Sequence, residues 1–268
     1  MERYVVLEKE VGETPLSAAE RFRATRPDLI GIPLSYAGRL DPMASGKLIV
    51  LIGEECKKQS EYHDLDKEYE FSVLFGISSD TGDVLGRLLP TKEQEVITEE
   101  TLRAIAASLI GELTFPYPLF SAKTVNGKPL HMWTLEGRLD EIEIPTRTST
   151  IYELELTKIE EKPRQEIAAT ALQKINTIPP VTDERKALGN DFRRTDIRAD
   201  WQDVASDYSL PPTYTIAHFR CIASSGAYMR TLAELIAKEL GTTGLAWHIY
   251  RTKIGKYSSE TNSWEFEY

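Results

Sequence analysis

Asp41 is the residue of this 268-residue chain that is best placed to do chemistry. It comes shortly before the apolar run Leu48–Ile52, which predicts a carboxylate at the mouth of a strand. Gly38 and Gly46 permit positive φ, and Pro42 fixes the backbone just after the carboxylate. Aspartate is ionised at neutral pH and can act as a nucleophile. The same residues are also typical of a surface turn, so their spacing alone leaves both interpretations open.

Three further segments combine charged and aromatic residues with turn or strand signals. The first opens an alternating run that predicts a half-buried strand, and the third precedes a predicted helix that ends near Gly241. They are Lys67-Glu68-Tyr69, Asp80-Thr81-Gly82-Asp83 and Ser224-Ser225-Gly226-Ala227-Tyr228-Met229-Arg230.

Taken as a whole, Gly38-x-Leu40-Asp41-Pro42 with the apolar strand behind it resembles the catalytic loop of tRNA pseudouridine synthases. It is most similar to the bacterial tRNA pseudouridine synthase B family. The three segments above follow in that family's order, and weaker similarities extend over most of the chain. Two loop residues depart from the pattern. Tyr36 stands where the family usually has a histidine, and Arg39 gives a Gly-Arg-Leu-Asp form more familiar from other pseudouridine synthase families.

The resemblance implies that the chain isomerises a uridine, with uridine 55 in the T-loop of tRNA as the expected target. Uracil leaves C1′ of its ribose, turns over and rejoins through C5, so neither a metal nor another cofactor is required. The base must first be flipped out of the folded RNA. By resemblance, Asp41 is the nucleophile, Arg230 pairs with it, and Tyr69 stacks on the flipped base and moves a proton late in the reaction.

Further substrate contacts are expected from the same resemblance. Tyr228 would line the pocket, Asp83 would reach Arg230, and Lys9 and Lys123 would touch RNA, although a lone lysine or tyrosine is more often a solvated charge or a core residue. Tyr36, at the histidine position of the family's loop, is a further candidate. The full set of substrate-binding candidates is Tyr36, Tyr228, Asp83, Lys123 and Lys9.

The implied fold is α+β, with a mixed, mostly antiparallel sheet flanked by helices and loops around a catalytic cleft. Local patterns agree with this. Thr14-Pro15 and Thr98 are typical helix starts, and Asn126-Gly127 predicts a hairpin turn. We expect one catalytic domain over residues 1–268.

Two departures from the family concern whole segments. At about 158–212, charges of both signs alternate and prolines recur, which predicts an insertion. It could be a mobile RNA-gripping loop, a partner site or a solvated excursion, and we favour the last because apolar anchors are few. The chain also ends a dozen residues after Lys256-Tyr257, so we expect no carboxy-terminal RNA-binding (PUA) domain.

We expect a cytoplasmic protein, and a monomer. No apolar run approaches the roughly 20 residues of a membrane span, and the first ten residues lack the order of a secretory signal. Two cysteines, Cys56 and Cys221, are too few for a disulfide framework. The formal charge of -10 opposes RNA binding, but local clusters can still contact phosphates. Candidate clusters are Lys123 with Lys128, and Arg251 with Lys253 and Lys256.

The sequence therefore favours a cofactor-free RNA uridine isomerase. One alternative is an inactive RNA-binding or RNA-folding module of the same family, which the acidic balance and the loop changes motivate. A second is a hydrolase that uses Asp41 to cleave a glycosidic bond, but no second carboxylate is evident at motif level.

Overall fold

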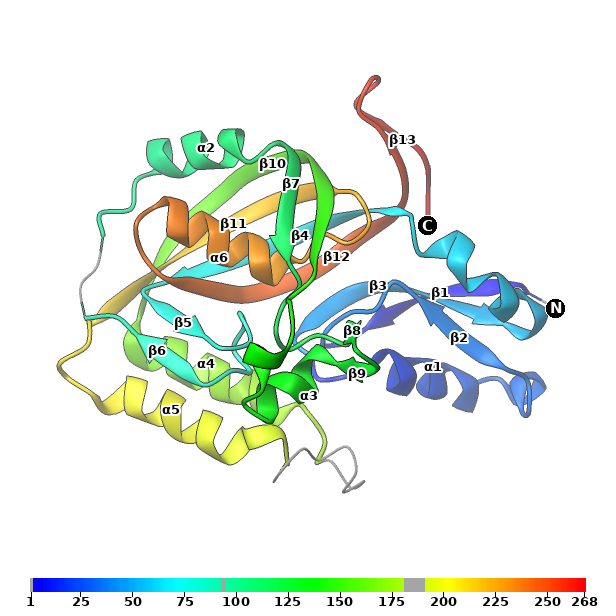
Figure 1. Cartoon of the computed structure of the whole chain (residues 1–268), viewed down its shortest axis with the longest axis horizontal. Coiled ribbons are helices and arrows are strands. Elements are labelled where there is room, and N and C mark those ends of the chain that lie inside the picture. Colours follow the sequence, from blue (N-terminus) through cyan, green and yellow to red (C-terminus); the bar gives the residue numbers. More distant parts are fainter. Residues whose placement is uncertain (1, 93–94, 181–190) are drawn as a thin grey trace.

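The computed structural model describes residues 2–92, 95–180 and 191–268 (Figure 1). Part of the predicted insertion, residues 181–190, lies outside the described residues. The strands are β1 (Tyr4–Lys9), β2 (Leu34–Ala37), β3 (Ala44–Ile52), β4 (Asp66–Phe75), β5 (Ile77–Ser79), β6 (Leu88–Pro90), β7 (Gly111–Pro116), β8 (Thr124–Val125), β9 (Lys128–Pro129), β10 (Thr146–Pro163), β11 (Thr213–Ala223), β12 (Gly244–Ser258) and β13 (Ser263–Glu267). The α-helices are α1 (Pro15–Ala24), α2 (Glu99–Ser108), α3 (Leu130–Leu135), α4 (Arg164–Asn176), α5 (Arg194–Ser206) and α6 (Met229–Glu239). Short 3₁₀ helices are η1 (Pro27–Leu29), η2 (Gly53–Tyr62), η3 (Leu139–Glu141) and η4 (Asp191–Arg193).

One large sheet organises the described chain. Its strands run in the order β1-β3-β12-β4-β11-β10-β7, with β2 added to β3 and β13 added to β12 (Figure 1). β3 and β12 pair in parallel, and the other pairs in this sheet are antiparallel. The prediction of an α+β fold with a mixed, mostly antiparallel sheet is confirmed. No helix within the described ranges is both long and apolar enough to cross a membrane.

Helices cover both faces of the sheet because the strands alternate their side chains. On β4, Tyr69, Phe71 and Val73 face α2 and α6 in one core cluster. Leu74, the residue after Val73, packs with α4 and α5 on the opposite face. The apolar run that follows Asp41 is buried along its whole length in β3, under α1 on one side and η2 on the other.

The predicted insertion differs from the solvated excursion that we favoured. β10 continues to Pro163 in register with β11, so the departure from the sheet begins at α4 and not at Lys158. α4 and α5 then pack on each other and bury an apolar stripe that includes Ile167, Ile175 and Trp201. The closely alternating charges hid this stripe in the sequence, because most of them lie on the outer faces of the helices, although Arg164 and Arg194 are buried.

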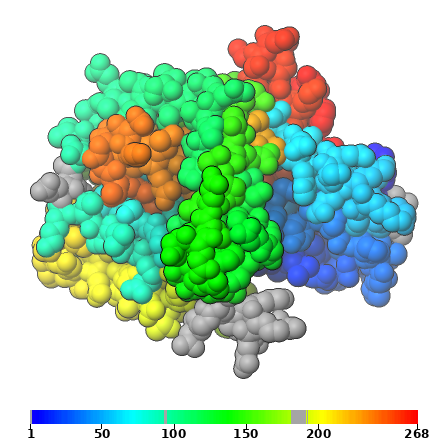
Figure 2. Space-filling view, in the orientation of Figure 1, coloured from blue at the N-terminus to red at the C-terminus, as the bar shows by residue number. Residues whose placement is uncertain are grey.

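Residues 117–145, here called the arm, form a small unit between β7 and β10. The arm holds β8, β9, α3 and η3, and Tyr117 N donates to Pro145 O at its base (3.0 Å). The predicted turn at Asn126-Gly127 joins β8 to β9, with positive φ at both residues. In the space-filling view the arm, in green, stands between the blue N-terminal elements and the orange α6 (Figure 2). It therefore lies beside the elements that carry Asp41 and Arg230.

Candidate active site

Asp41 and Arg230 form an ion pair across 189 positions of sequence. Arg230 Nε donates to Asp41 Oδ2 at 2.8 Å. The arginine side chain is only 4% exposed, whereas the carboxylate is 38% exposed. Burial disfavours the charge of Arg230, but the neighbouring carboxylates Asp41 and Asp83 outweigh it and raise the pKa of the guanidinium. Arg230 therefore stays buried and charged, and it orients the partly exposed carboxylate of Asp41.

The backbone around Asp41 explains how the carboxylate is aimed. Ala44 N donates to Asp41 O (3.0 Å), and Gly12 N donates to Pro42 O (2.8 Å). Gly46 has φ +105°, and a Cβ there would lie 2.4 Å from the carbonyl oxygen of Arg251. A side chain at Gly46 would thus push β3 away from β12, which is why the loop needs glycine where it enters the strand.

Two buried cations hold the same loop from beneath. Lys9 Nζ donates to Ala44 O (2.6 Å), and Arg251 donates to Gly38 O (2.8 Å) and Lys47 O (2.7 Å). Lys9 is 0% exposed and Arg251 is 1% exposed. Both residues were expected to contact RNA from the surface. Instead, the side chains of Lys9 and Arg251 are buried, because β1 and β12 flank β3 and place them under the loop.

Arg230 uses all three guanidinium nitrogens. Besides the carboxylate, Nη1 donates to Thr81 O (2.6 Å) and Nη2 to Phe120 O (3.3 Å). Asp83 is buried, and its described hydrogen bonds come from Thr81 Oγ1 (2.7 Å) and Leu85 N (2.9 Å). Burial raises the pKa of Asp83 and the charge of Arg230 opposes that rise, so these two residues interact through charge. The sequence had not singled out the carbonyls of Thr81 and Phe120, because carbonyls carry no residue signature.

The two predicted tyrosines differ in how they relate to this pair. Tyr69 is buried in the core cluster that also contains Leu40 and Met229, the direct neighbours of Asp41 and Arg230. Tyr228 precedes α6, and burial together with the negative charge of Asp41 raises the pKa of its phenol. The structure thus places Tyr228 close enough to Asp41 for their charges to interact, and it places Tyr69 in the core cluster that contains chain neighbours of the pair.

Lys123 and Tyr36 have different surroundings. The Lys123 ammonium is exposed and lies 5.0 Å from the ring centroid of Tyr117, whose ring meets that of Tyr228 edge-on at 5.9 Å. A positive charge therefore stands near the phenols. Tyr36 instead packs with Ala18 and Leu48 beneath α1, so the structure does not bring its side chain together with the other candidates.

Lys67 and Arg147 add positive charge that the sequence analysis missed. Lys67 Nζ donates to His63 O (3.1 Å), and burial, reinforced by Arg251, lowers its pKa to about 7. Arg147 donates to Ser225 O (3.1 Å) in the loop before α6. The single glycine of that loop was a usable signal, because a Cβ at Gly226 would collide with the Arg147 guanidinium.

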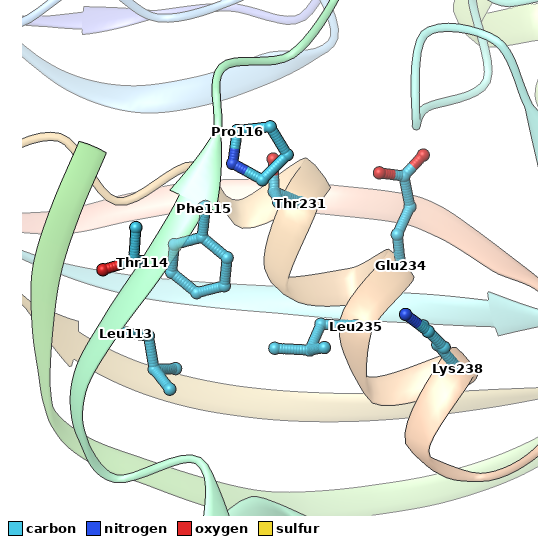
Figure 3. Close-up of a pocket in the computed structure, with 8 residues that line it drawn as sticks. All are labelled: Leu113, Thr114, Phe115, Pro116, Thr231, Glu234, Leu235 and Lys238. Carbon is cyan, nitrogen blue, oxygen red and sulfur yellow. The ribbon is translucent and has the colours of Figure 1, made fainter. Parts of the chain in front are cut away.

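A separate hollow of about 280 Å³ lies between β7 and α6 (Figure 3). Glu234 and Thr231 line it from the helix, and Phe115 and Pro116 line it from the strand. Thr231 directly follows Arg230, yet the candidate residues themselves are not part of this lining. We therefore place the candidate site by the ion pair and not by the hollow. Among the residues described, no group of three or more His, Cys, Asp or Glu could hold a metal ion.

Solved structures share this fold. A crystal structure of a Cbf5–Nop10–Gar1 complex matches 94% of this chain and 49% of its own chain, with a TM-score of 0.53 and 16% identity. A structure of an H/ACA ribonucleoprotein bound to a substrate RNA containing 2′-deoxyuridine matches the same share of this chain with a TM-score of 0.50 and 14% identity. At such low identity these matches show the fold class alone.

Sequence comparison identifies the family. The family model described as "TruB family pseudouridylate synthase (N terminal domain)" matches residues 33–175, more than half of the chain. The chain belongs to this family, and the resemblance stated from its motifs is confirmed.

Named relatives agree with this assignment. tRNA pseudouridine synthase 4 of Saccharomyces cerevisiae is 26% identical over 87% of this chain and 63% of its own length. tRNA pseudouridine synthase B of Aromatoleum aromaticum is 30% identical over 95% of this chain and 63% of its own length, and that of Bacillus cereus is 29% identical over 97% and 68%. The chain thus spans less than two thirds of the first two relatives.

Proposed function

We propose that this chain is a pseudouridine synthase that isomerises a uridine of RNA, with the T-loop uridine of tRNA as its target. The observation that carries the proposal is the 2.8 Å pair of Asp41 and Arg230, in which a locked, buried arginine orients a half-exposed carboxylate. Family membership supports the same reaction, because the relatives named above are tRNA pseudouridine synthases.

The site residues take complementary roles in this proposal. Asp41 attacks the flipped nucleotide, the bond between C1′ and N1 breaks, and a bond between C1′ and C5 forms. C5 then loses its proton and N1 gains one, so no atom is gained or lost overall. Arg230 orients the carboxylate, and the ring of Tyr69 stacks on the uracil. Tyr228 and Asp83 fix the walls of the site, and we propose that Lys9 supports the loop from beneath.

RNA contacts would come from cations around the carboxylate despite the acidic balance of the chain. Arg39 and Lys123 are exposed, and Arg147 is half-buried beside the loop before α6. Phosphate binding depends on such local charge and weakens with salt. We propose that the chain acts as one catalytic domain, as a monomer, in the cytoplasm. The large continuous sheet, which runs from β1 to β7, supports the first of these points.

The test is conversion of unmodified tRNA by the wild type and by Asp41→Asn, mapped by carbodiimide-dependent primer arrest. We expect an arrest at the T-loop uridine with the wild type and a loss of more than about a thousandfold in rate with the variant, because the nucleophile is removed. Asp203→Asn, the same change at an exposed residue of α5, is the control and should retain full activity.

Two outcomes would overturn the proposal. No arrest on tRNA with the folded wild type would favour an inactive RNA-binding module. Release of free uracil would indicate a hydrolase, since isomerisation releases none.

A further inference from the structure

We propose that Arg193, the last residue of η4 and directly before α5, is a positioning residue for the Asp41–Arg230 pair. Arg193 lies outside the active site, but it holds the same two segments that orient Arg230. This inference rests on the proposed function, because it assigns the insertion a role in that reaction.

The first contact joins Arg193 to the loop between β5 and β6. Arg193 Nη1 donates to Asp80 Oδ2 at 2.5 Å, and Nη2 lies 3.3 Å from Asp80 Oδ1. Asp80 also accepts from Arg87 N (2.9 Å), so its side chain is fixed within its own loop. The next residue, Thr81, supplies the carbonyl that receives Arg230 Nη1. A two-point ion pair is more directional than a single contact, so it can fix the loop as well as attract it.

The second contact joins Arg193 to the base of the arm. Its guanidinium carbon lies 4.5 Å from the centroid of the Phe120 ring. The carbonyl of Phe120 receives Arg230 Nη2. Arg193 and Arg230 thus contact the same two segments. Arg193 contacts the side chains of Asp80 and Phe120, whereas Arg230 donates to backbone carbonyls.

α5, which directly follows Arg193, reinforces this arrangement. Trp201 Nε1 donates to Val84 O (3.0 Å), and Asp200 accepts from Arg87 Nε (2.6 Å) and Leu88 N (3.1 Å). The insertion therefore supports the loop on which Thr81 and Asp83 lie. If Arg193 is removed, Phe120 loses its cation–π contact with the insertion and Asp80 loses its ion pair. Arg230 could then turn away from Asp41 without any change in the residues that touch RNA.

The test compares Arg193→Ala with Arg198→Ala, an arginine one turn further along α5 that bonds Asn176 (2.9 Å). Single-turnover rate at saturating tRNA and the dissociation constant for tRNA are measured separately. For Arg193→Ala we expect a rate about tenfold lower with a dissociation constant within about twofold, because misplacement of a catalytic group costs rate and not affinity. Arg193→Lys should recover part of the rate, since it keeps the ion pair but not the planar stack. Arg198→Ala should match the wild type.

Hydrogen exchange separates this inference from the proposed function. Amides of residues 80–88 and 117–123 should exchange faster in Arg193→Ala than in Arg198→Ala, whether or not the wild type modifies tRNA. A weakened tRNA affinity with an unchanged saturating rate would overturn the proposal and make Arg193 an RNA contact. Unchanged exchange in both segments would also overturn it. A wild type without activity but with the expected exchange would defeat the proposed function alone.

Discussion

The Asp41 loop and the arm lie close together, yet they are held in opposite ways. The loop, residues 38–47, receives bonds from cations that are buried in distant strands, Lys9 in β1 and Arg251 in β12. The arm is held mostly by its own residues. Trp133 donates to Val125 O (3.1 Å), and its ring lies 4.4 Å from the Lys128 ammonium.

This difference indicates which of the two segments can change conformation when RNA binds. Opening the loop would leave two buried cations without acceptors, which is costly. Opening the arm would break contacts that are local in sequence and largely exposed, such as the ion pairs of Glu136 with Lys128 and Arg138. We expect the arm to adapt to RNA while Asp41 stays fixed.

The largest expected effect comes from breaking the pair at the centre of the fixed region. Arg230→Met should lower the single-turnover rate by more than about a thousandfold and the free energy of unfolding by about 3 kcal/mol, because Thr81 O and Phe120 O lose their buried donor. Rate assays and urea unfolding measure both. Lys238→Met, an exposed change on the same helix, is the control. Equal stability of the two variants would contradict a locked arginine.

The next effect concerns pH and Lys9. Burial lowers the pKa of Lys9 to about 8, although Glu13 and Asp41 oppose the shift. Between that value and about 10.4, the usual value for the unfolded chain, the unfolded state binds more protons, so this lysine adds stability as pH rises, by at most about 1.4 kcal/mol per unit.

Urea unfolding of the wild type and Lys9→Met at pH 8 and pH 9.5 measures this contribution. The advantage of the wild type should grow with pH, by about 1–2 kcal/mol over that interval. An advantage that is constant or shrinks would mean that burial does not lower the pKa of Lys9 in the folded protein.

A smaller effect is expected from a conservative change beneath the loop. Arg251→Lys keeps the charge but cannot bond Gly38 O and Lys47 O with one planar fork, so it should cost about 1 kcal/mol of stability and several-fold in rate. Lys256→Arg, at an exposed position of the same strand, is the reverse control and should change neither. Full activity of Arg251→Lys would show that charge alone holds the loop.

The smallest effect on the rest of the protein, here called the body, is expected from a substitution in the arm. Trp133→Ala removes the residue around which the arm packs, but the main unfolding transition should shift by less than about 0.5 kcal/mol, because the arm opens separately. Amide exchange within residues 124–141 should rise strongly in the same variant. A loss of about 3 kcal/mol in the main transition, the usual cost of a core tryptophan, would show that the arm and the body unfold together.

Local patterns in the sequence predicted much of the frame. Thr14 caps α1 with Pro15 at its first position, and the period-two pattern from Tyr69 predicted the strand β4, but the expectation of a half-buried strand was wrong because helices cover both of its faces. Such features depend on neighbours in the chain, so they can be read from it directly. The motifs around Asp41 and Arg230 also identified the two ends of the ion pair, although only by resemblance.

Long-range features were less predictable. Lys9 has the residue type of a surface charge, and the alternating charges around α4 and α5 hid the stripe that contains Ile167 and Trp201. Tyr36 occupies the family's histidine position, yet its ring packs beneath α1 because its place in β2 opposite Val50 turns it to that face. These outcomes depend on which strand lies beside which.

The sequence by itself determined the chemistry available to this protein: a carboxylate in a glycine-flanked turn, an arginine at a helix start, and phenols near both. Only the tertiary structure decided how that chemistry is held. Strand pairing brought buried cations under the turn, and the insertion brought Arg193 to the segments that orient Arg230. The physical reason is that a turn or a helix start is fixed by adjacent residues, whereas burial of a charge depends on partners that the chain supplies from far away.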